Sequence, residues 1–256
     1  MHAFLTMMTG LLRPSRAFDR IGSAARWLWI PLALILVASV LIKTSVAAPL
    51  ESAAMTEQAD AFMEQEMESW TEDERAQYER DMAEMEASGD LMLDTSDDTT
   101  AAIVSTAAMV FGIVGAIAAV LYTATFFFIT AKTQANPVAF PTMLTAASLS
   151  LFPHAIRNIV QTISMATSGT WIQHAGLGAL VAPIEATDAP SVAYAILSQI
   201  DVWTIWGLLL IFGALLSTAV GFSRKRAVSA MLVFVCITGI IQALPIIAQG
   251  LLLGAM

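Results

Sequence analysis

Charged residues are scarce in this chain of 256 residues, and their scarcity limits the class of protein it can be. Only 13% of the residues are charged, about half of the roughly 25% that a soluble domain carries. Hydrophobic residues make up 57%, and the mean hydropathy is +0.71. These values exclude an ordinary soluble domain and indicate a membrane protein.

Cysteine and the motifs of common enzymes are also missing. Cys236 is the single cysteine, so it cannot form an internal disulfide, and we expect it to pack as a small apolar side chain. The chain has no nucleophile elbow, zinc motif or phosphate-binding glycine loop. It also has no pair of carboxylates inside an apolar run for acid–base chemistry. We therefore predict a protein that is not an enzyme, holds no cofactor or metal and has no nucleic-acid partner.

Long apolar runs are the main feature that is present. A helix needs about 20 mostly apolar residues to cross a bilayer, and five stretches satisfy this requirement. The predicted fold class is an all-α polytopic membrane protein, a bundle of five transmembrane helices. The predicted spans are residues 27–47, 100–130, 138–165, 202–221 and 227–253.

The basic residues predict how these spans thread the membrane, because Lys and Arg near span ends stay on the cytoplasmic side. Eight of the twelve lie before the first span, between the second and third, or between the fourth and fifth. The last of these loops holds Arg224, Lys225 and Arg226, which we interpret as topology anchors. The pattern predicts a cytoplasmic N-terminus and an external C-terminus.

Residues 1–26 have apolar side chains at helical spacing before Pro14, which is typical of an interfacial helix. Such a helix either braces the first span on the membrane surface or docks a partner. On the other side of the membrane, residues 166–200 form an external loop that is poor in charge. We expect a short interfacial helix at its end, from residue 191 to residue 200.

Residues 48–99 form an acidic insert outside the bilayer, since 17 of the 21 acidic residues lie between Glu51 and Asp98. Apolar side chains recur in it at helical spacing, which predicts two amphipathic helices. Thr71 and Glu74 form a capping box for the second helix, and Gly89 is a stop signal. We expect the insert to cap the outer ends of the spans; the alternative is a lobe that binds a partner. The candidate interface residues are Phe62, Met63, Met67, Trp70, Tyr78, Met82 and Met85.

Polar side chains interrupt the third span on one helical face. His154, Arg157, Asn158 and Gln161 stand at positions i, i+3, i+4 and i+7. Ionisable groups in a membrane usually face the bundle interior and find partners, and Asp201 at the outer end of the fourth span is within reach of Arg157. In the simpler interpretation the aspartate only caps the fourth span while the arginine reaches outward to the interface. In the functional one the polar face lines a wet cavity or contacts a substrate.

Small residues in the second span, Ala108, Gly112 and Ala116, form a seam that allows another helix to approach closely. The approaching helix belongs either to this bundle or to a partner protein.

Two further elements stand out in the last two spans: the entry Asp201-Val202-Trp203-Thr204-Ile205-Trp206 and the later turn Ser223-Arg224-Lys225-Arg226-Ala227. Shorter elements precede them: Arg13-Pro14-Ser15 with Phe18 and Ile21, Phe140, and Leu151-Phe152-Pro153. In these elements and their order the chain resembles the Yip family (Ypt-interacting proteins, Yip-one domain) of five-span membrane proteins, in its bacterial branch. The acidic insert departs from the family pattern, and the Gly-Pro and Tyr-Gly-Tyr elements of the eukaryotic branch are absent. The resemblance implies a bacterial inner-membrane protein, some of whose relatives work beside ABC exporters.

Two functions follow as hypotheses. The first is a non-enzymatic accessory or assembly partner of a membrane complex such as an ABC-type exporter, acting through the acidic insert and a lipid-facing seam. The second is a small permease or lipid-interacting protein that uses the face of His154 and Arg157. Both hypotheses imply contact with membrane lipids, and both are compatible with a homo-oligomer.

Overall fold

The computed structural model describes residues 18–19, 27–88, 98–134, 137–172, 176–182 and 191–253. Regular structure within these ranges is helical throughout, which confirms the predicted all-α class. The helices are α3 (Trp29–Glu68), α4 (Glu72–Ser88), α5 (Asp98–Thr133), α6 (Phe140–Ser168), η2 (Gly176–Leu180), α7 (Val192–Leu197), α8 (Val202–Leu215) and α9 (Arg224–Leu253).

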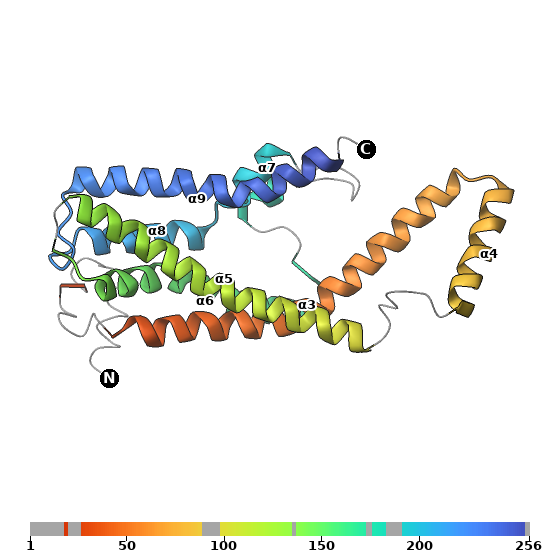
Figure 1. Ribbon diagram of the computed structural model, residues 1–256, viewed down its shortest axis with the longest axis horizontal. Helices are drawn as coiled ribbons and strands as arrows, with labels where there is room; N and C mark the ends of the chain where they lie inside the picture. Colours follow the sequence, from red (N-terminus) through yellow and green to blue (C-terminus); the bar gives the residue numbers. More distant parts are fainter. Residues whose placement is uncertain are drawn as a thin grey trace.

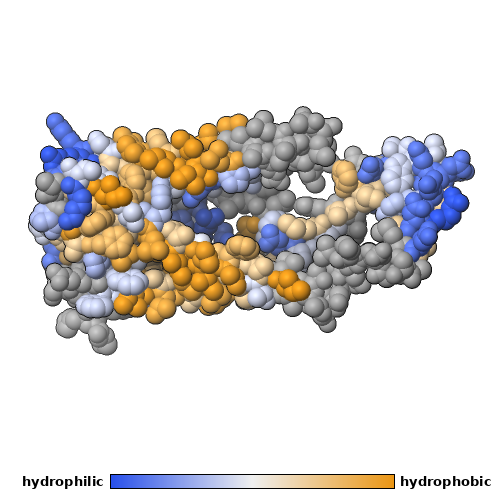
Figure 2. All heavy atoms as spheres, in the orientation of Figure 1, coloured by the Kyte–Doolittle hydropathy of each residue, from blue (hydrophilic) through white to orange (hydrophobic). Residues whose placement is uncertain are grey.

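Helices α3, α5, α6, α8 and α9 lie along one another and form the bundle (Figure 1). Helix α6 is central because it packs against α3, α5 and α8. Every residue of α6 from Thr142 to Ser150 is buried, and Phe127, Leu210 and Leu215 fill the core around it. The face seen in Figure 2 carries two broad hydrophobic bands along the bundle, and many large apolar side chains of the bundle are exposed. A bundle that is apolar outside and polar in its central helix is typical of a membrane protein.

Three of the described helices, α3, α5 and α9, are long and apolar enough to cross a membrane. Helix α8 is apolar but has 14 residues, which is below the roughly 20 that a span requires. It ends earlier than the predicted span 202–221, because the chain turns after Leu215 and the backbone N–H of Phe222 donates to the carbonyl of Leu215 (3.0 Å). The structure thus shows a helical membrane protein, whereas the count of five spans stays a prediction.

Helix α3 is longer than the first predicted span, because it continues as one helix of 40 residues into the acidic insert. Pro49 lies inside it, and the helix changes direction along its length (Figure 1). A proline in a helix interior removes one backbone hydrogen bond and produces a kink. The drop in hydropathy after residue 47 therefore marks the end of an apolar surface and not the end of a helix.

The outer part of α3 from residue 50 and helix α4 together form what we call the arm. The capping box predicted at its bend is confirmed, since Glu74 Oε2 accepts from the backbone N–H and from the hydroxyl of Thr71, both at 2.8 Å. The ring of Trp70 meets that of Tyr78 edge to face at 5.2 Å. Gly89 lies outside the described residues.

The arm projects from the end of the bundle, and α4 stands apart from the other helices (Figure 1). The expectation that the insert caps the outer ends of the spans is therefore wrong. The physical reason is the continuity of α3, which carries the chain away from the bundle before α4 begins.

The predicted interfacial helix 1–26 lies outside the described residues, apart from Phe18 and Asp19. Phe18 is fully buried in the core. The carboxylate of Asp19 accepts from the backbone N–H and from the hydroxyl of Thr218, both at 2.7 Å. These contacts attach the start of the chain to the turn after α8.

Candidate functional site

The polar face of α6 begins with an ion pair to α8. Arg157 Nη1 lies 2.8 Å from Asp201 Oδ2, so the contact predicted from the sequence is confirmed. Asp201 also caps α8, because its Oδ1 accepts from the backbone N–H of Thr204 at 2.6 Å. Asp201 therefore has two roles, since one oxygen serves the cap and the other serves the arginine, and the interpretation in which it only caps the fourth span is wrong. The side chain of Asp201 is nearly buried, at 9% exposure, so loss of Arg157 would leave it without a partner of opposite charge.

The next residues of the face turn toward α3. Asn158 Nδ2 donates to Ser39 Oγ at 3.1 Å, and the buried Ser39 hydroxyl donates to the carbonyl of Leu36 at 2.7 Å. Gln161 Oε1 is buried and has no hydrogen-bond partner among the described residues. The face therefore divides, with Arg157 bound to α8 and Asn158 bound to α3, and it fixes α6 between them.

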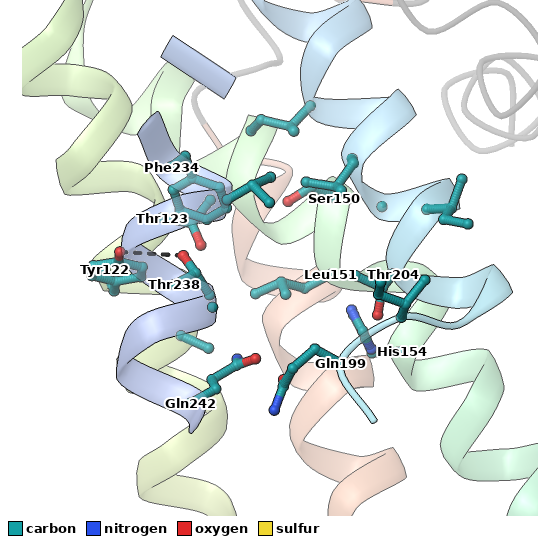
Figure 3. Close-up of a pocket in the computed structure, with 18 of the residues that line it drawn as sticks. Tyr122, Thr123, Ser150, Leu151, His154, Gln199, Thr204, Phe234, Thr238 and Gln242 are labelled. Carbon is teal, nitrogen blue, oxygen red and sulfur yellow. Dashed lines mark hydrogen bonds between the residues drawn. The ribbon is translucent and has the colours of Figure 1, made fainter. Parts of the chain in front are cut away.

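His154 faces a cavity of about 570 Å³ that lies between α5, α6, α8, α9 and the turn before α8. Figure 3 shows its side chain pointing into the cavity across from Gln199 and Gln242. On the α5 side, the hydroxyls of Tyr122 and Thr238 lie 3.2 Å apart and join α5 to α9. The polar lining consists of Tyr122, Thr123, Ser150, His154, Arg157, Ser198, Gln199, Thr204, Thr238 and Gln242.

The side chains that line the cavity are suited to hydrogen bonding rather than to catalysis. Within the described residues, no group of three or more His, Cys, Asp or Glu side chains is placed to hold a metal ion. His154 is the one imidazole of the lining, and the other polar groups there are hydroxyls, amides and the paired guanidinium of Arg157. Such a set can orient a polar molecule, because it presents both donors and acceptors.

The sequence did not single out most of this lining. Tyr122 and Thr123 come from α5, while Thr238 and Gln242 come from α9. The available signal was a pair of polar residues four positions apart in the otherwise apolar stretch 230–248 of α9, which places them on one face. That spacing alone does not say which neighbouring helix the face meets.

The small-residue seam of α5 lies partly against α3. A side chain added at Gly112 would place its first carbon 2.7 Å from Val40 Cγ1. Ala116 packs on the core, whereas Ala108 is exposed. Gly112 therefore allows α5 to pack closely against α3. The prediction that the seam faces lipid and contacts a partner protein is wrong at this position.

The candidate interface residues lie along the arm. Phe62 and Met82 are exposed, at 48% and 38%. The side chain of Met85 lies outside the described part. The other four candidates are half-buried: Met63, Met67, Trp70 and Tyr78.

The topology anchors Arg224, Lys225 and Arg226 are exposed at the start of α9. Lys132 lies at the end of α5, at the same end of the bundle and opposite the end from which the arm projects (Figure 1).

The packed helices, the apolar exterior and the polar central helix define the class of this protein as a helical integral membrane protein. Within that class its family is clear, because the Yip1 domain matches residues 9–244 and the chain belongs to the Yip1 domain family. No curated protein and no solved structure matches the chain.

Proposed function

We propose that this Yip1 domain protein is a non-enzymatic accessory or assembly partner of a membrane complex, and that the arm is the part that binds the partner. The observation that carries the proposal is the exposure of large apolar side chains on a helical arm that stands apart from its own bundle. An ABC-type exporter is the candidate complex, on the resemblance to bacterial relatives that work beside such exporters.

The composition of the arm supports a protein partner. Met and aromatic side chains are enriched at the centre of protein interfaces, and Met adapts to different partner surfaces. Phe62 and Met82 present such side chains on helices that are otherwise rich in acids. The acids keep the arm soluble and favour a partner surface with basic residues around an apolar centre.

The threading that accompanies this proposal has five spans, with a cytoplasmic N-terminus in a bacterial inner membrane. Its support is the position of Lys132 and of the basic turn at residues 224–226 at the bundle end opposite the arm. Basic residues favour the cytoplasmic side, so the arm and the C-terminus lie on the external side. Labelling of single cysteines from outside intact cells tests this arrangement, with an arm residue expected to react and a residue of the basic turn expected to remain protected.

Photo-crosslinking in native membranes tests the role of the arm. A photoreactive amino acid at position 62 or 82 is expected to give one discrete product with another membrane protein, which mass spectrometry identifies. The matched control places the same amino acid at Glu57, an exposed acidic position of α3. The double variant Phe62→Ser, Met82→Ser is expected to separate the protein from that partner during purification, with no loss of folded protein. No product at either apolar position, or equal products at all three, would contradict the proposal.

A second candidate is a small permease or a lipid-interacting protein. The specific observation in its favour is the cavity next to His154, because a polar cavity in a membrane bundle is a suitable site for an amphipathic molecule.

A further inference from the structure

We propose that the cavity between α5, α6, α8 and α9 binds a membrane glycerolipid, with an uncharged or zwitterionic head group inside it and the acyl chains along the apolar outer surface. This inference deepens the second candidate function, and it does not require the arm to bind a partner. The two proposals can therefore fail separately.

The size and lining of the cavity suit the head group of a lipid. Its volume of about 570 Å³ lies within the range of about 300 to 1,000 Å³ that small-molecule sites occupy. His154, Gln242 and the hydroxyl of Thr204 line it and have no hydrogen-bond partner among the described residues. These donors and acceptors are therefore available to a head group with ester, hydroxyl or amine groups.

The charge balance favours a head group without net charge. Arg157 is the one lining residue with a permanent charge, and Asp201 already neutralises it at 2.8 Å. Lys43 of α3 also acts electrostatically on Arg157, but it is not among the lining residues. A fully anionic head would compete with Asp201 for the guanidinium, whereas a zwitterionic or uncharged head leaves that ion pair intact.

The mouth of the cavity opens on the surface that faces lipid. Ile205 of α8 and Val235 of α9 both line the cavity and are 50% and 44% exposed. Figure 2 shows hydrophilic atoms in a hollow between the two apolar bands of the bundle. A lipid could therefore enter sideways from the bilayer and leave its acyl chains on those bands, where burial of apolar surface favours binding.

Two glycines provide a blocking variant and its matched control. A Cβ atom added at Gly239 meets nothing within 4 Å, and Gly239 lines the cavity, so Gly239→Phe is expected to place its ring in the site. Gly115 of α5 also has open space around it but is not among the lining residues. Gly115→Phe therefore adds the same bulk at a position of α5 that does not line the cavity.

Native mass spectrometry of the full chain in mild detergent tests the proposal, with phosphatidylethanolamine and phosphatidylglycerol as probes. The unaltered protein is expected to retain one phosphatidylethanolamine in preference to phosphatidylglycerol. Gly239→Phe is expected to weaken this binding by about tenfold or more, while Gly115→Phe leaves it unchanged. His154→Leu with Gln242→Leu is expected to abolish the preference between the two lipids, and these two changes serve as the test if Gly239→Phe does not fold.

Three results would overturn the assignment. The first is that no lipid is retained by the unaltered protein. The second is that the Gly239 and Gly115 variants bind lipid equally. The third is a preference for phosphatidylglycerol, which would refute the uncharged or zwitterionic head group. Each result is independent of the crosslinking at the arm, so a failure here leaves the proposed partner binding intact.

Discussion

The ion pair between Arg157 and Asp201 permits a quantitative test of how polar groups hold this bundle together. Asp201→Asn is the most informative change, because an asparagine oxygen can still accept the N–H of Thr204 and cap α8. The variant thus keeps the cap and removes only the charge. Arg157→Met removes the other charge and keeps most of the length of the side chain.

The expected magnitude follows from the geometry. Two unit charges 2.8 Å apart attract by about 6 kcal/mol at an effective dielectric constant of about 20. Desolvation of the nearly buried carboxylate offsets much of this attraction, whereas loss of one partner leaves the other charge unpaired. We therefore expect Asp201→Asn to lower the free energy of unfolding by about 2 to 3 kcal/mol. Arg157→Met together with Asp201→Asn should cost less than the sum of the two single changes, with a coupling energy of about 2 kcal/mol.

The assay is reversible unfolding in mixed detergent micelles, followed by the fluorescence of the six tryptophans. Asp81→Asn removes an exposed acid of the arm and is the control, with an expected effect within about 0.5 kcal/mol. Additive costs for the two members of the pair would refute the reasoning, since additivity means that the two charges do not stabilise each other.

Three further predictions concern the contacts around the bundle and the arm. Gly112→Leu should destabilise the packing of α5 on α3 by about 1 to 3 kcal/mol, whereas Gly115→Leu should have little effect in the same unfolding assay. Tyr122→Phe should cost about 1 kcal/mol, because it removes the hydroxyl that joins α5 to α9. The backbone N–H and the hydroxyl of Thr71 lower the pKa of Glu74. The cap should therefore be fully formed above the usual pKa of a glutamate and lost as the pH falls through the lowered pKa. Amide hydrogen exchange at the start of α4 measures this loss. Glu74→Ala should produce the same increase in exchange at neutral pH.

The ion pair could be predicted from the sequence because it needs only two facts. Helical spacing places His154, Arg157, Asn158 and Gln161 on one face, and alternation of the helices brings the start of α8 to the C-terminal half of α6. The partner of Asn158 was not predictable in the same way. Ser39 is one of several hydroxyl residues in α3, and only the rotation of α3 about its axis determines which of them meets the amide.

The cavity and the position of the arm could not be predicted, because both depend on three-dimensional geometry that residue spacing does not determine. Five segments contribute to the cavity lining, so its existence depends on the angles at which those helices cross. The arm was misplaced for a different reason, because the predicted span ended with the apolar run at residue 47, whereas the backbone continues past Pro49 as one helix. A proline removes one hydrogen bond of a helix, and the rest of the ladder can continue past the kink.

Helix α6 shows why polarity and depth in the bundle are linked. By length and composition α3, α5 and α9 are apolar enough to cross a membrane, and α6 is not among them. Yet α6 is the helix that packs against α3, α5 and α8, and its residues from Thr142 to Ser150 are all buried. A helix that packs against several others can carry Arg157 and Asn158 because its neighbours supply Asp201 and Ser39, whereas a helix with lipid on all sides has no such partners. The low hydropathy of α6 therefore fits its central position, and two of the polar groups that lower it, Arg157 and Asn158, fix α6 against α8 and α3.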